Sequence, residues 1–183
     1  MTESLIAPSA RARFVVTLPP EPSRIAEQLQ RASGASFTTL TDTQDAFLHL
    51  ASRARDRLVI MTPFIDNAGA AWATDLFEAT LAPRKELVVR DMEQLDACSQ
   101  VERLRAAITG CHAYRFAGEH AGQPSETFHA KIVLADGVAA YVGSANFLYR
   151  SKETNLECGF LLEGDAVAPV ATLVEAVLGM FTP

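Results

Sequence analysis

The middle of the chain alternates between short apolar runs and segments with helical spacing. Residues 57–61, 86–90 and 112–116 have the pattern of strands that are largely buried. Residues 70–81 and 93–109, which lie between these runs, have the spacing of helices. Strands that alternate with helices pack in layers, so this pattern predicts an α/β fold with a mixed, mostly parallel sheet flanked by helices.

Further elements are expected on both sides of this alternation. Residues 13–18 predict a short strand, and residues 22–32 predict a short helix. Residues 41–44 resemble a capping box and are followed by apolar side chains at helical spacing. A polar stretch at residues 117–125 interrupts the alternation, and residues 166–181 predict an apolar helix that closes the fold.

The composition fits one globular domain. Of the 183 residues 49% are hydrophobic, and a chain of this length buries about 70% of its unfolded surface. This excludes a disordered chain, and the net charge of -6 excludes a histone-like basic coat. The three cysteines show no CxxC spacing, which indicates free thiols in a reducing compartment. We find no signal-peptide pattern and no apolar run of about 20 residues, so we expect a soluble, cytoplasmic protein without a membrane anchor.

The sequence between residues 127 and 146 predicts a β-hairpin. Two strand-like runs flank the pair Asp136-Gly137, and an Asp-Gly pair favours a type I′ turn because both central residues need a positive φ. If these two residues form the whole loop, His129 lies directly opposite Ser144.

This hairpin would gather polar groups on one face, because side chains alternate along a strand. The four groups are an imidazole, an ammonium, a hydroxyl and an amide, carried by His129, Lys131, Ser144 and Asn146. The last three can hold the anionic oxygens of a phosphate ester. The imidazole is then left free to attack phosphorus.

A further strand expected at residues 155–162 would add a carboxylate. Asn155 and Glu157 share one face of this strand. If it pairs beside the hairpin, Glu157 lies against the imidazole of His129, where it would fix the tautomer and support the positively charged form.

Together these residues resemble a known signature. The pattern His-x-Lys-x-x-x-x-Asp at residues 129–136, Gly-Ser-x-Asn at 143–146 and Asn-x-Glu at 155–157 is similar to the HKD signature of the phospholipase D superfamily. The match covers the C-terminal third closely, and the strand–helix order from about residue 57 is similar to one superfamily half-domain. We therefore expect a phospholipase D-like catalytic domain at residues 41–183 and an N-terminal extension of unknown role at residues 1–40.

The resemblance implies a metal-independent, cofactor-free phosphodiester transfer through a covalent phosphohistidine. A second copy of the motif supplies the acid in this family, so a chain with one motif implies a homodimer with both His129 residues in one shared site. By the same resemblance, Lys131 and Asn146 hold the phosphate, Ser144 assists and Glu157 orients the imidazole. Lys131 is expected on the rim of the site.

The remaining polar residues have simpler interpretations. Asp136 belongs to the signature, but seven residues of strand would put it roughly 20 Å from His129, so we expect a structural role at the hairpin end. Asn155, Arg150 and Lys152 are candidate substrate contacts. The other histidines lack metal-ligand spacing, and we expect Trp72 to pack in the core.

Three functions are compatible with these residues. The first is a nuclease that cleaves DNA or RNA, with a role in bacterial or phage defence and other subunits as partners. The alternatives are a phospholipase or phosphatidyl transferase, and a non-catalytic nucleic-acid-binding subunit of a defence complex. Because residues 111–183 carry fewer basic than acidic side chains, we expect modest, salt-sensitive affinity for nucleic acid.

Overall fold

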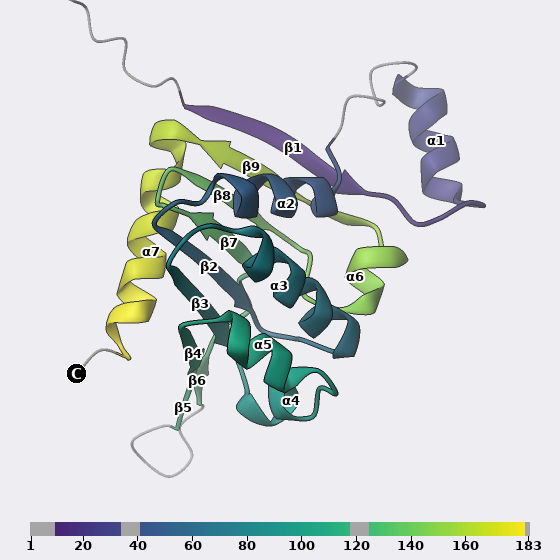
Figure 1. The fold of residues 1–183 in the computed structure, drawn as a ribbon. Coiled ribbons are helices and arrows are strands. Elements are labelled where there is room, and N and C mark those ends of the chain that lie inside the picture. The colour runs from purple at the N-terminus through teal and green to yellow at the C-terminus, as the bar shows by residue number, and fades with distance from the viewer. Residues whose placement is uncertain (1–9, 34–40, 118–124, 182–183) are drawn as a thin grey trace, which may run out of the picture.

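A seven-stranded sheet forms the centre of the computed structural model, which describes residues 10–33, 41–117 and 125–181 (Figure 1). The strand order is β1-β9-β8-β7-β2-β3-β4, and β5 and β6 form a separate two-stranded sheet. The strands are β1 (Arg11–Thr17), β2 (Arg57–Thr62), β3 (Arg84–Val89), β4 (Gly110–Ala113), β5 (Arg115–Phe116), β6 (Glu126–Thr127), β7 (Ile132–Ala135), β8 (Ala139–Gly143) and β9 (Glu157–Glu163).

The predicted α/β class is confirmed, and the sheet is mixed. β2, β3 and β4 pair in parallel, as expected for strands joined by helices. β7 joins β2 antiparallel, and β8, β9 and β1 continue the sheet with antiparallel pairs. Antiparallel pairing therefore extends over more of the sheet than the strand–helix alternation suggests.

Helices cover both faces of the sheet. Phe47 of α2, Trp72 of α3 and Leu104 of α5 belong to the larger apolar cluster on one face, and Figure 1 shows α2 and α3 lying across that face. Val174 and Val177 of α7 pack on the other face. The helices are α1 (Arg24–Ser33), α2 (Thr43–Arg53), α3 (Asn67–Ala79), α4 (Met92–Asp96), α5 (Val101–Ala107), α6 (Tyr149–Glu153) and α7 (Ala168–Gly179), with a 3-10 turn, η2 (Gly164–Val167), before α7.

The hairpin is present, but its register differs by one residue from the expected one. The loop contains Val138 as well as the expected Asp-Gly pair, and Ala135 is paired with Ala139. Asp136 and Gly137 have φ angles of 53° and 70°, as a type I′ turn requires. In this register Lys131 faces Gly143, whose N–H donates to its carbonyl, so the predicted pairing of His129 with Ser144 is wrong.

Two predictions within the helices also need correction. The helix expected at residues 93–109 is divided into α4 and α5, because the chain turns between them and the N–H of Ser99 donates to Asn67 Oδ1 at 2.7 Å. The N-cap of α2 is Asp42, whose carboxylate accepts from the N–H of Asp45.

Most of the polar stretch at residues 117–125 lies outside the described residues.

The segment expected to be an N-terminal extension contributes a strand to the sheet. β1 pairs with β9 along its whole length, from Arg11 opposite Glu163 to Thr17 opposite Glu157. β1 thus lies directly beside the strand that begins with Glu157. Within the described ranges, no helix has the length and apolar character needed to cross a membrane.

Candidate active site

The chain between β6 and β7 carries the first part of the candidate site. Lys131 Nζ lies 2.8 Å from the carbonyl oxygen of His129 and 2.9 Å and 3.2 Å from the two ring nitrogens. The imidazole is exposed, whereas Lys131 is only 6% exposed, so the expectation of a lysine on the rim is wrong. The buried ammonium of Lys131 therefore contacts the exposed imidazole of His129.

The charge of Lys131 is shaped by burial and by Glu157. Burial lowers the pKa of Lys131 from its usual value, and the negative charge of Glu157 opposes that shift. Both side chains are buried, Lys131 with 6% and Glu157 with 5% of its surface exposed. The site therefore combines a buried cation with a buried anion.

Glu157, the first residue of β9, is held by Ser144, which follows β8, and by Asn155, which lies two positions before it. Ser144 Oγ donates a short hydrogen bond to one carboxylate oxygen, and Asn155 Nδ2 donates to the other at 3.3 Å. The N–H of Cys158 donates to Ser144 Oγ at 3.0 Å, which fixes the hydroxyl. The hydrogen bonds of Glu157 therefore go to Ser144 and Asn155, and the imidazole contacts Lys131 instead.

Asn146 has unused hydrogen-bonding capacity. Its N–H donates to Ser151 Oγ at 3.3 Å, which anchors the backbone. Its Oδ1 is buried and has no hydrogen-bond partner among the described residues. Because buried polar atoms in folded proteins are nearly always paired, the unpaired Oδ1 marks Asn146 as a candidate residue of the site.

The loop that follows β2 forms a wall beside His129. Thr62 Oγ1 donates to the carbonyl of Phe64 at 2.9 Å and accepts from the N–H of Phe147 at 3.2 Å. The Phe64 ring, held in this way, lies 5.8 Å from the His129 ring at an angle of 75°. Aromatic contacts of this geometry limit the orientations that an exposed imidazole can adopt.

Arg90 also contacts this wall, and the sequence pattern did not identify it as a site residue. Its guanidinium carbon lies 4.3 Å from the centre of the Phe64 ring, which is a cation–π contact. Arg90 directly follows β3, the parallel neighbour of β2. The available signal was its place at the carboxyl end of a parallel strand, where ligands of α/β proteins commonly bind.

Asp136 lies at the other end of β7 from Lys131. Its carboxylate accepts hydrogen bonds from the N–H groups of three consecutive residues, at 2.8, 2.9 and 2.8 Å, which are Arg55, Asp56 and Arg57. Burial alone would raise its pKa, but these donors hold the pKa of Asp136 below its usual value. Asp136 therefore joins the hairpin turn to the start of β2 and does not contact the other signature residues.

The two basic candidates lie on α6. Lys152 Nζ is 5.9 Å from the centre of the Trp72 ring and 3.9 Å from Glu153 Oε1. The side chain of Arg150 is exposed, and its carbonyl accepts from the N–H of Asn155 at 2.7 Å. Trp72 packs in the core against Phe47 at 4.8 Å, as expected.

The other described histidines are paired with carboxylates. His49 Nε2 lies 3.3 Å from a carboxylate oxygen of Glu163, and His112 Nε2 lies 2.9 Å from one of Glu86. His120 lies outside the described residues. In the part of the chain that the structure describes, no group of three or more His, Cys, Asp or Glu residues is placed to hold a metal ion.

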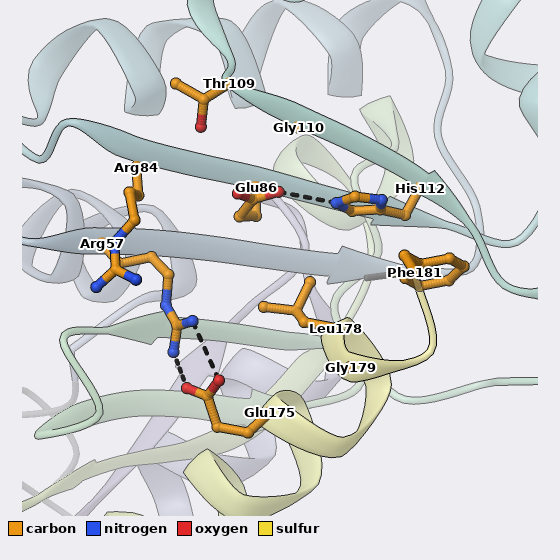
Figure 2. A pocket seen from close by; sticks show the side chains of 10 residues that line it. All are labelled: Arg57, Arg84, Glu86, Thr109, Gly110, His112, Glu175, Leu178, Gly179 and Phe181. Atoms are coloured by element: carbon orange, nitrogen blue, oxygen red, sulfur yellow. Dashed lines mark hydrogen bonds and ion pairs between the residues drawn. The ribbon is translucent and has the colours of Figure 1, made fainter. Parts of the chain in front are cut away.

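His112 belongs to a hollow of about 380 Å³ beside α7 (Figure 2). Figure 2 shows that Arg57 is paired with Glu175 and that His112 is paired with Glu86. The charges in this hollow are therefore neutralised within the chain. The candidate site at His129 differs, because its imidazole is exposed and Asn146 Oδ1 has no hydrogen-bond partner in the part of the chain that the structure describes.

Comparisons with known proteins identify the family and the fold. Residues 47–177 match the sequence model of a family described as cardiolipin synthase, PLD-like domain. Comparison with curated proteins gives no significant match.

Three solved structures share the fold. NucT from Helicobacter pylori has a TM-score of 0.60 and 13% identity, and the match covers 93% of this chain and 97% of NucT. The phospholipase D family member Nuc from Salmonella typhimurium has a TM-score of 0.52 and 14% identity, and the match covers 94% of this chain and 91% of Nuc. Phosphatidylserine synthase from Haemophilus influenzae Rd KW20 also has a TM-score of 0.52, with 15% identity, but only 38% of that chain is covered against 93% of this one. With more than half of its length matched by the family's sequence model and with this fold, the chain belongs to the phospholipase D superfamily.

Proposed function

We propose that this chain is a metal-independent phosphodiesterase that cleaves DNA or RNA through a covalent phosphohistidine. The observation that supports this most strongly is the exposed His129 imidazole held directly against the buried Lys131 ammonium. The exposed ring can reach a phosphodiester as the nucleophile, and the fixed cation beside it can bind the phosphate oxygens. Superfamily membership supports phosphodiesterase activity in general.

The first step is attack of a His129 ring nitrogen on phosphorus. A nitrogen–phosphorus bond forms while the bond from phosphorus to the leaving oxygen breaks. Lys131 and the amide of Asn146 bind the non-bridging oxygens, whose negative charge increases in the transition state. The leaving oxygen takes a proton from a second imidazole, which we assign to His129 of a second copy of the chain.

The second step releases the phosphate from the enzyme. The second imidazole, now neutral, accepts a proton from water, and the oxygen of that water attacks phosphorus. The nitrogen–phosphorus bond breaks, which restores His129 and leaves a phosphate monoester. Both steps need two imidazoles on opposite sides of one phosphorus, so we propose a homodimer with a shared site.

The coverage of the similar structures favours a single-motif enzyme. The match spans nearly all of NucT and Nuc but only 38% of phosphatidylserine synthase. A chain of about the same size as these two proteins supports the assignment to the single-motif nucleases that the signature resembles. Lipid turnover remains the competing activity, because the same groups act on any phosphodiester.

The test is cleavage of labelled DNA, labelled RNA and phospholipid vesicles in the presence of EDTA. We expect the wild type to cut at least one nucleic acid and His129→Ala to cut none, since the nucleophile is absent. His49→Ala is the matched control, because His49 is paired with Glu163 outside the site. Lipid turnover without nucleic-acid cleavage would replace the proposal with a phospholipase.

The covalent intermediate can be tested separately. Acid quenching destroys phosphohistidine, so the reaction is stopped with alkaline denaturant and the protein is digested for mass spectrometry. We expect an adduct on the peptide that contains His129, in which the phosphorus still carries one part of the cleaved strand. Binding of nucleic acid without an adduct or products would instead indicate a non-catalytic subunit of a larger complex.

A further inference from the structure

We propose that Arg90 binds the phosphate next to the one that is cleaved, and that this contact selects a nucleic-acid strand over a single phosphodiester. This inference rests on the proposed nuclease function and assigns a substrate contact outside the HKD signature. Three observations carry it: the position of Arg90, its charge environment and the way its side chain is held.

The position of Arg90 puts it beside the nucleophile. Arg90 and His129 both pack on the Phe64 ring, at 4.3 Å and 5.8 Å from its centre. Phe64 follows β2, Arg90 follows β3, and these two strands run parallel as neighbours. Their carboxyl ends therefore bring an aromatic ring against the imidazole and a cation against the same ring.

The charge of Arg90 has no carboxylate partner within the described part of the chain. The adjacent carboxylate of Asp91 accepts from the N–H of Glu93 and from Arg115, at 3.0 Å and 2.9 Å. At the opposite end of β3, by contrast, Arg84 is paired with Asp56. Arg90 is half-buried, so it is less fully hydrated than an arginine on the open surface.

The way the side chain is held favours phosphate binding. A guanidinium that lies over an aromatic ring keeps its N–H donors at its edge, where they can reach two oxygens of one phosphate. The reacting phosphate already has Lys131 and Asn146 as ligands. A polynucleotide presents further phosphates along its strand, whereas a phospholipid with two acyl chains and one headgroup has a single phosphodiester, so Arg90 fits the former.

The main experiment compares two substrates in the full-length protein. One is a single-stranded oligonucleotide, of DNA or RNA according to what the wild type cuts, and the other is bis(4-nitrophenyl) phosphate, which has one phosphodiester. For Arg90→Gln we expect kcat/KM on the oligonucleotide to fall about tenfold more than on the small substrate. Arg84→Gln is the matched control, because Arg84 begins the strand that Arg90 follows but is already paired with Asp56.

Salt dependence provides a readout that a structural role would not change. In the His129→Ala background, which binds without cutting, Arg90→Gln should reduce the slope of log affinity against log salt concentration by about 0.7. Arg90→Lys keeps the charge, so it should retain the slope while binding more weakly. This second variant preserves the test if Arg90→Gln does not fold.

The possible results separate this inference from the proposed function. Equal losses on both substrates, or an unchanged salt slope in a protein that cuts oligonucleotides, would overturn the role of Arg90 alone. If the wild type hydrolyses only the small substrate and neither cuts nor binds an oligonucleotide, the nuclease proposal fails and this inference fails with it.

Discussion

The charged ammonium of Lys131 is buried, and contacts within the site offset the cost of that burial. A buried ammonium is costly unless its N–H donors are used, and Lys131 donates to the carbonyl and the ring of His129. Glu157, also buried, offsets part of the cost through its negative charge. The resulting cation has a fixed position, which is what stabilisation of a developing charge on phosphate requires.

We predict that Lys131→Met strongly reduces turnover without unfolding the protein. The methionine keeps most of the buried volume but cannot bind phosphate oxygens, so kcat should fall by about 10²- to 10³-fold. The measurements are kcat and the melting temperature. Lys85→Met is the control, because Lys85 donates to the carbonyl of Phe77 outside the site. Near-normal turnover in Lys131→Met would contradict the role of Lys131 as the phosphate ligand.

At the scale of elements, the hairpin shows what the sequence could predict. The Asp136-Gly137 pair correctly indicated a turn with two positive φ angles. The loop length was missed because valine is typical of strands, which assigned Val138 to the strand. In addition, the carboxylate of Asp136 is bound by N–H groups some 80 positions earlier in the chain. Such long-range contacts leave no local pattern.

Long-range contacts also explain two other differences between the predicted and the observed structure. Residues 97–100 contain no glycine or proline, so the break between α4 and α5 depends on tertiary contacts such as that of Ser99 with Asn67. Arg90 was assigned to a strand, and its contact with Phe64 depends on the pairing of β3 with β2. The residues of the signature could be identified because they lie within 30 positions of one another, in and beside three consecutive strands, β7, β8 and β9.

We predict that Asp136→Asn destabilises the fold at neutral pH and leaves catalysis intact. Asparagine tolerates a positive φ but weakens the hydrogen bonds to Arg55, Asp56 and Arg57. The free energy of unfolding at pH 7 should therefore fall by about 1–3 kcal/mol. Urea unfolding measures this change, and kcat well below the melting temperature should remain near that of the wild type.

The pH dependence of that difference has a definite sign. The folded pKa of Asp136 is lowered from the usual 3.8, so its ionised form stabilises the fold above that pH. This contribution is lost as the pH falls through the folded pKa, and the wild type should then approach the variant in stability. Asp75→Asn, an exposed carboxylate near Arg103, serves as the control. A constant difference between pH 7 and pH 2 would show that the carboxylate charge is not what stabilises the turn.

At the scale of the whole molecule, one chain supplies only part of the proposed site. The HKD signature occurs once, and the match spans nearly the full length of NucT and Nuc. The net charge of -6 does not conflict with a polyanionic substrate, because phosphate binding depends on local groups such as Lys131 and Arg90. A second copy would bring another set of these cations to the same substrate.

We predict that inactive chains suppress the activity of active ones. When wild-type and His129→Ala chains are refolded together in equal amounts, random assortment leaves about a quarter of the dimers with two wild-type chains. Because a mixed dimer has only one His129 imidazole and is inactive, activity per wild-type chain should fall to roughly half of that of wild type refolded alone. The mixture should then have about a quarter of the activity of wild type refolded with His49→Ala, in which every dimer is active. Activity that stays proportional to the wild-type chain would mean that each chain acts alone. In that case the proton for the leaving oxygen must come from a group within the same chain, and the shared site would have to be abandoned.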